Sequence, residues 1–218
     1  NEGKSWSTVT NDLSLLTSYK MVFSEENPDK LFVATNGHGV YHSWDRGRNW
    51  AVVGRQEDLQ YVTALAVDGD NVFAYDASSQ KVYKSIKVWD ATGSDYHYGW
   101  EDIFDLSLVD SSDHVKSLVV EGNTIFAGTS KNGIFKSTTG GGAWEQIGSN
   151  DVRWLEIDPN NRNRIYAGFV GEQGTIHESN DEGESWDRLN NHLTFSSVHE
   201  IVVDPTNESG VALNLLQQ

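Results

Sequence analysis

Among the charged side chains that could take part in catalysis, acidic ones predominate in this 218-residue chain, which carries 32 Asp and Glu against 16 Lys and Arg. Acid–base or nucleophilic catalysis by carboxylates needs two of them facing each other. The acidic candidates lie in polar loops, and no pair stands out by its spacing. They are Glu57, Asp58, Asp76, Glu101, Asp102, Asp105, Asp110, Asp113, Asp151 and Glu172. The sequence therefore identifies no catalytic residue.

Metal and thiol chemistry have less support still. The chain has no Cys, and its 7 His show no spacing typical of metal ligands. The segment DGDN at Asp68–Asn71 is similar to the start of a calcium loop, but it aligns with EGNT at Glu121–Thr124, which favours a hairpin turn. We therefore expect neither a metal nor a cofactor.

Charge and hydropathy exclude two further classes. The net charge of −16 repels phosphate backbones and anionic lipid, so nucleic-acid binding is not expected. No apolar run approaches the 18 residues or so that a membrane-spanning helix needs. We expect no membrane insertion.

The chain is built from a sequence repeat, and the repeated elements must position any functional site. Tryptophans recur at intervals of 42 to 50 residues, at Trp6, Trp50, Trp100, Trp144 and Trp186. Similar apolar segments precede them, such as VTALAVDG from Val62 and VKSLVVEG from Val115. These segments are rich in β-branched and aromatic residues and are separated by Gly, Asn, Asp and Pro, a pattern typical of short strands and hairpins.

Each repeat offers four short strands, and such a unit must stack on its neighbours to bury both faces of its sheet. Radial stacking predicts an all-β fold, a β-propeller of four-stranded antiparallel blades in a single domain over 1–218. The expected repeats are 17–60, 61–113, 114–150 and 151–196, with partial repeats at 1–16 and 197–218. Since these two are partial, we expect further blades or another chain to complete the ring.

Three repeats contain a related octet that ends in Trp: SWDRGRNW (43–50), STTGGGAW (137–144) and SNDEGESW (179–186). The pattern S-x-D-x-G-x-x-W resembles the Asp-box, or bacterial neuraminidase repeat. The Asp-box β-propeller superfamily includes sialidases, xyloglucanases, sortilin-type receptors and photosystem II assembly-factor-like proteins. The resemblance implies the propeller fold, places the boxes on the face away from the ligand, and implies no single activity.

We interpret the box residues as structural. The Asp side chains accept hydrogen bonds from the turn backbone, the Gly residues allow a positive φ, and the Trp rings pack on the blade. Thr139, where the pattern has Asp, fits this role and not a catalytic one. The set is Ser43, Asp45, Gly47, Trp50, Ser137, Thr139, Gly141, Trp144, Ser179, Asp181, Gly183 and Trp186.

Cationic residues form the first candidate binding site. Lys116, Arg153 and His199 occupy the second position of the expected innermost strands, as does Thr63. Equivalent positions lie at one level around the central opening, where a cationic rim could bind a carboxylate or another anion. The alternative is ordinary ion pairing with neighbours such as Glu156.

Aromatic residues outside the boxes form the second candidate. Trp89, Tyr96 and Tyr98 belong to an insert, 88–100, that replaces one box, and Trp154 follows Arg153. The resemblance implies that exposed rings could stack on sugars. The alternative is that they cap an enlarged blade edge.

The sequence favours a non-catalytic binding or scaffold module for carbohydrate or protein, secreted, extracellular or periplasmic. One alternative is a glycoside hydrolase of sialidase or xyloglucanase type, although a sialidase-like arginine cluster is missing. Another is an assembly factor for a membrane or redox complex, in which Lys116 and Arg153 would dock an acidic partner.

Overall fold

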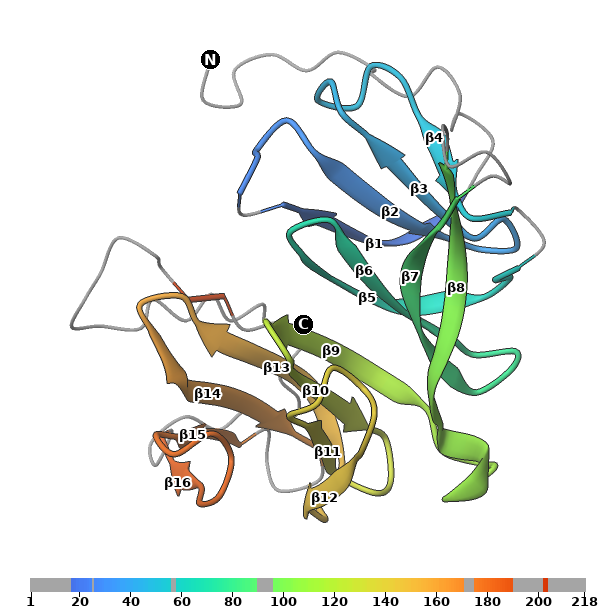
Figure 1. The fold of residues 1–218 in the computed structure, drawn as a ribbon. Helices are drawn as coiled ribbons and strands as arrows, with labels where there is room; N and C mark the ends of the chain where they lie inside the picture. Colours follow the sequence, from blue (N-terminus) through green and yellow to red (C-terminus); the bar gives the residue numbers. More distant parts are fainter. Residues whose placement is uncertain are drawn as a thin grey trace. The chain divides into compact units, whose positions relative to one another are not determined.

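The computed structural model describes residues 17–24, 26–55, 58–89, 96–170, 175–189 and 202–203 (Figure 1). In these ranges the elements are strands and one short 3-10 turn, Leu106–Leu108. The strands form four antiparallel sheets of four strands each. The fold is a β-propeller of four-stranded antiparallel blades, which confirms the predicted fold class. No helix in the described part of the chain could cross a membrane.

Each blade is a meander in which the strands pair in chain order. Blade 1 contains β1 (Ser18–Phe23), β2 (Leu31–Thr35), β3 (Val40–Ser43) and β4 (Ala51–Val53). Blade 2 contains β5 (Val62–Asp68), β6 (Asn71–Asp76), β7 (Lys81–Trp89) and β8 (Tyr96–Asp105). Blade 3 contains β9 (Val115–Glu121), β10 (Thr124–Thr129), β11 (Ile134–Ser137) and β12 (Glu145–Gly148). Blade 4 contains β13 (Val152–Asp158), β14 (Asn161–Phe169), β15 (Ile176–Ser179) and β16 (Asp187–Arg188).

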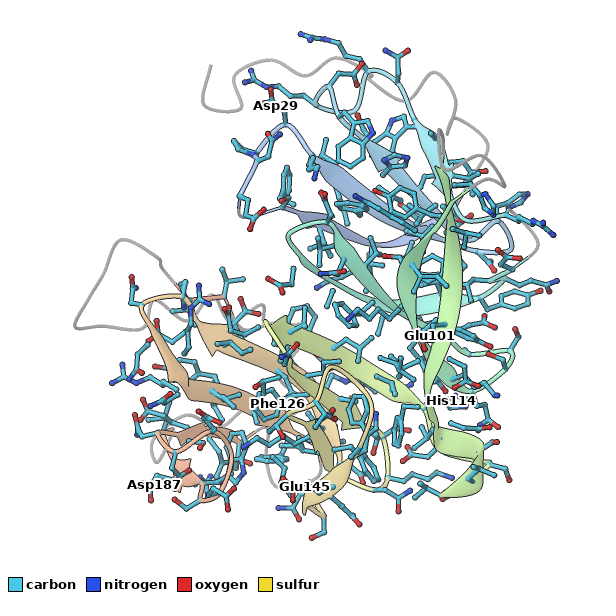
Figure 2. All side chains as sticks on the ribbon, in the orientation of Figure 1. Asp29, Glu101, His114, Phe126, Glu145 and Asp187 are labelled. Carbon is cyan, nitrogen blue, oxygen red and sulfur yellow. The ribbon has the colours of Figure 1, made fainter. Side chains whose placement is uncertain are left out.

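The chain divides into two compact units, Asn1–Asp102 and Ile103–Gln218, and each has its own core. In the first unit, Phe32 and Ala34 of blade 1 pack with Leu65 of blade 2. In the second, Phe126 of blade 3, which Figure 2 labels, packs in one core cluster with Leu155 of blade 4. The second strand of a blade is covered on both faces, and all five residues of β2 are buried. The buried residues of such strands are therefore mostly apolar and do not alternate with polar ones.

Tryptophan side chains join neighbouring blades. In the second unit, Nε1 of Trp144 donates a hydrogen bond to the carbonyl of Ile103, which belongs to β8, at 2.8 Å. In the first unit, Nε1 of Trp100 donates to the carbonyl of Val53 at 3.1 Å. Trp100 therefore retains the inter-blade contact although its repeat has no box.

Candidate functional site

The turns between the third and fourth strands of blades 1, 3 and 4 share one hydrogen-bond pattern. The hydroxyl of Ser43 accepts the backbone N–H of Gly47 at 2.8 Å. The equivalent distances are 3.0 Å from Ser137 to Gly141 and 2.7 Å from Ser179 to Gly183. These glycines have φ values of 82°, 103° and 90°, a region that favours Gly. The box residues thus hold tight turns.

The acidic box residues are bound within their own turns. The backbone N–H and side-chain amide of Asn49 lower the pKa of Asp45 to about 2. The hydroxyl and N–H of Ser185 lower the pKa of Asp181 to about 2 as well. A general acid needs a pKa near the working pH, so neither carboxyl suits that role.

In the third box, both residues of the equivalent side-chain contact differ: Thr139 stands in the position of Asp45, and Ala143 stands in the position of Asn49. Thr139 accepts the N–H of Ala143 at 2.8 Å through its hydroxyl, the bond that Asp45 and Asp181 make through a carboxylate. Ala143 has no side-chain donor, and Thr139 has no second oxygen that would need one. The two substitutions therefore preserve the turn, which supports the structural interpretation of Thr139.

An extra residue bulges from the innermost strand of every blade. The pairing of inner and second strands shifts register around one residue, which is left without a partner opposite it. These residues are Tyr19, Thr63, Lys116 and Arg153, and all four are exposed. A bulge re-aims a side chain, and bulges are over-represented beside active sites. The sequence pattern found the last three positions and missed Tyr19, because β1 lacks the V-x-x-L signature.

In the second unit, Lys116 and Arg153 project from the equivalent bulges of two neighbouring blades. Their strands are tied together by Ser117, whose hydroxyl accepts the backbone N–H of Leu155 at 3.1 Å. Neither cation has an ion pair within the described residues, so the alternative of ordinary pairing with Glu156 finds no support there. Two exposed and unpaired cations at matching positions can bind an anionic group.

Two buried carboxylates brace the loops near the bulges. Asp76 accepts the N–H of Tyr61 at 2.7 Å. Asp113 accepts the N–H of His114 at 2.7 Å and the amide of Asn132 at 2.8 Å. Burial alone would raise both pKa values, but the hydrogen bonds outweigh it and lower them. Both groups are therefore ionised loop anchors and poor candidates for a general acid.

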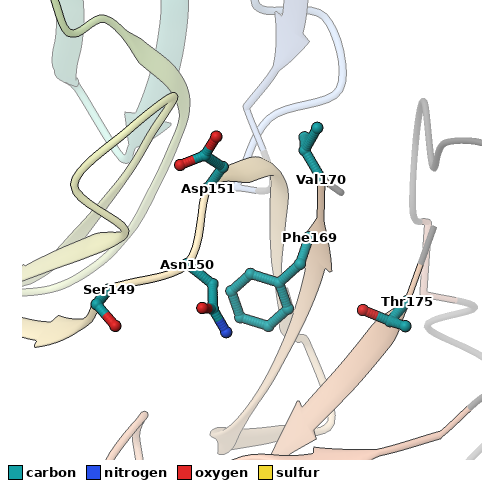
Figure 3. A pocket seen from close by; sticks show the side chains of 6 residues that line it. All are labelled: Ser149, Asn150, Asp151, Phe169, Val170 and Thr175. Carbon is teal, nitrogen blue, oxygen red and sulfur yellow. The ribbon is translucent and has the colours of Figure 1, made fainter. Parts of the chain in front are cut away.

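A cavity lies where the connector from β12 to β13 meets the end of β14 and the residue that precedes β15 (Figure 3). It measures about 220 Å³, and we call it the loop cavity. Its lining residues are Ser149, Asn150, Asp151, Phe169, Val170 and Thr175. Asp151 lies two residues before Arg153, so the loop cavity and the cationic bulge share one edge of the blade.

One of the residues that line the loop cavity departs from the pattern of the other blades. The residue paired with the strand position before the bulge is Thr35, Asp76 or Thr129 in blades 1 to 3, and Phe169 in blade 4. The three polar residues bond to their own loops, for example through the Thr35 hydroxyl to the Gly39 carbonyl at 2.7 Å. Phe169 cannot do so. The sequence shows this difference once the strands are aligned, but sequence reasoning missed it.

The aromatic candidates are not brought together in the described residues. Tyr98 packs edge-on against His42 inside the first unit, with ring centroids 6.0 Å apart, and Trp154 is half-buried in the second unit. The side chains of Trp89 and Tyr96 lie outside the described part of the structure, as does His199. Within that part, no group of three or more His, Asp or Glu side chains could hold a metal ion.

Comparison with known proteins finds likeness in structure alone. No family model matches the chain, and no curated protein matches its sequence. Among solved structures, an ancestral GH74 enzyme is 20% identical with a TM-score of 0.61 over 91% of this chain. The GH74 xyloglucanase from Xanthomonas campestris is 16% identical with a TM-score of 0.57 over 81% of this chain. This chain spans only 28% and 31% of those two proteins.

A second group of similar structures is named YCF48. The structure titled YCF48 bound to D1 peptide is 17% identical, with a TM-score of 0.59, over 86% of this chain and 58% of that one. YCF48 from Cyanidioschyzon merolae is 13% identical, with a TM-score of 0.57, over 92% of this chain and 72% of that one. At these identities the likeness shows the fold and no shared activity.

Proposed function

We propose that this chain is a non-catalytic, extracytoplasmic propeller module that binds a protein partner through an acidic group. The observation that carries the proposal is the pair of exposed cations, Lys116 and Arg153, on equivalent bulges of neighbouring blades. They stand out in a chain with a net charge of −16, and no ion pair in the described residues neutralises them. A carboxylate of the partner can bind both through charge-assisted hydrogen bonds.

One of the structural neighbours supports a protein as the partner. One YCF48 structure is titled as bound to a peptide, and peptides carry the carboxylates that exposed cations select. Of the two aromatic candidates whose side chains the structure describes, Tyr98 packs against His42 inside the first unit and Trp154 is half-buried. On this proposal the chain is a docking module that binds an acidic partner, as an assembly factor would.

The test uses a fluorescent Glu-rich hexapeptide and its Gln-rich analogue, with binding followed by anisotropy. We expect only the Glu-rich probe to bind, about tenfold more weakly for Arg153→Glu or Lys116→Glu, because each change replaces attraction by repulsion. Arg188→Glu, the same charge change on the exposed strand β16, is the matched control and should leave binding unchanged. Equal binding of the two probes, or equal loss in the control, would contradict the proposal.

The GH74 neighbours keep a glycoside hydrolase as the second candidate. Reducing-sugar release from xyloglucan and from a sialoside panel tests it directly. Hydrolysis at a rate that survives Lys116→Glu and Arg153→Glu would favour the enzyme over the docking module.

A further inference from the structure

The loop cavity contains a buried polar group for which the described residues provide no hydrogen-bond partner. Thr175 is 1% exposed, and its buried hydroxyl has no hydrogen-bond partner within the described residues. Leaving a buried hydroxyl without a partner destabilises the folded state, and a valine of the same shape would avoid that cost. Figure 3 shows this oxygen turned toward the ring of Phe169. A ligand in the loop cavity could supply the missing hydrogen bond.

The charge of the lining indicates a ligand that donates hydrogen bonds. Asp151 is half-buried and has no ion pair in the described part of the chain, and the side chains of Asn150 and Ser149 add further acceptors. Among the described residues that line the loop cavity there is no Lys, Arg or His. An ammonium or guanidinium group is the natural complement of such a lining.

The size and floor of the loop cavity restrict the ligand further. Pockets for drug-sized ligands measure about 300–1,000 Å³. The volume here, about 220 Å³, suits a single side chain. The ring of Phe169 packs edge-on against His177 and Trp186, at centroid distances of 4.8 and 6.0 Å, and is therefore held in place. A fixed ring can contact both an aliphatic stem and a cation.

We propose that the loop cavity binds one basic side chain, Lys or Arg, of the protein partner, an inference that rests on the proposed function. Its stem contacts Phe169 and Val170, and its charged group pairs with Asp151 and donates to Thr175. Asp151 and Arg153 are two residues apart, or about 7 Å along a strand. The partner segment therefore carries a basic side chain and an acidic group within two or three residues of each other.

The first experiment uses acetyl-arginine methylamide as the probe and acetyl-citrulline methylamide as its neutral analogue. Binding to the whole chain is followed through the NMR amide signals of Asn150, Val170 and Thr175. We expect saturable shifts with the arginine probe, and an affinity about fivefold lower for citrulline or for Asp151→Asn, since each removes the ion pair. Glu145→Gln, the same charge change on exposed strand β12, should have no effect.

A second variant separates binding from folding. Thr175→Val should keep or raise the melting temperature, because it removes a buried hydroxyl without a partner, and should weaken the arginine probe severalfold. Equal affinity for citrulline, or an unchanged affinity in Asp151→Asn, would overturn the proposal. The proposal would also be overturned if methyl glucoside, and not the arginine probe, shifted the amide signals of the same residues. If the Glu-rich peptide failed to bind while the arginine probe bound as expected, only the proposed function would be overturned.

Discussion

At the scale of residues, each blade pairs one aromatic ring on its second strand with a polar residue on its third. The cross-strand pairs are Phe32–His42, Phe73–Lys84, Phe126–Lys136 and Tyr166–Glu178. The two lysine ammonium groups lie 5.5 and 5.7 Å from the Phe ring centroids, within cation–π range. Tyr166 instead donates its hydroxyl to Glu178 at 3.3 Å. A His or Lys side chain therefore faces each Phe ring, and a hydrogen-bond acceptor faces the Tyr.

The box carboxyls should make stability depend on acid. Because the folded pKa of Asp45 and Asp181 is about 2, below the unfolded value, their contribution is present above about pH 4 and is lost as the pH falls toward 2. Thr139 does not titrate, so the stability of the third box turn should not depend on pH in this range. NMR titration of the side-chain carboxyl carbons checks this, and a midpoint near 4 for either group would contradict it.

His42 should add a second pH dependence with the same sign. Burial and the nearby charge of Lys30 lower its folded pKa below 6.5. The unfolded chain then binds the proton more readily, so this contribution is complete above pH 6.5 and declines as the pH falls below it. His42→Phe fits among the rings of Phe32 and Tyr98 and should flatten the decline in urea melts between pH 7 and 5. An unchanged slope would exclude His42 as its source.

At the scale of elements, the inter-blade tryptophans matter more than the box motif around them. Gly54 lies so close to Trp100 that an added Cβ would stand 2.4 Å from Nε1. In the second unit, a Cβ added at Gly141 would stand 2.7 Å from the Cβ of Ile103. Each contact joins a turn or outer strand of one blade to the next blade. The repeat conserves the ring at the interface, and the insert in blade 2 replaces only the turn.

Trp100→Phe should therefore destabilise the first unit by about 1 kcal/mol, because it leaves the carbonyl of Val53 without its donor. Trp44→Phe is the control. This ring is 45% exposed, so the same change there should cost less than about 0.5 kcal/mol. Urea denaturation of both variants measures the difference, and equal losses would show that Trp100 does not clamp the blades.

At the scale of the whole molecule, a net charge of −16 opposes compaction through self-repulsion. Added salt screens that repulsion, so the melting temperature should rise by several degrees between about 10 and 150 mM NaCl. Binding of the Glu-rich probe to Lys116 and Arg153 should weaken over the same range. Because salt should raise the melting temperature and lower the affinity for the probe, one salt titration distinguishes the two effects. A melting temperature that falls with salt would mean that attractive ion pairs dominate.

The sequence by itself determined the fold class, since its repeat of β-branched segments and tryptophans admits only stacked four-stranded blades. It also indicated the turn roles of Asp45, Thr139 and Asp181, because those depend on contacts within a few residues. It could not show that Tyr19 occupies a bulge, that Trp100 clamps a blade, or that Phe169 and Thr175 enclose a cavity. These features arise from strand register and from contacts between segments far apart in the chain, which no local pattern encodes.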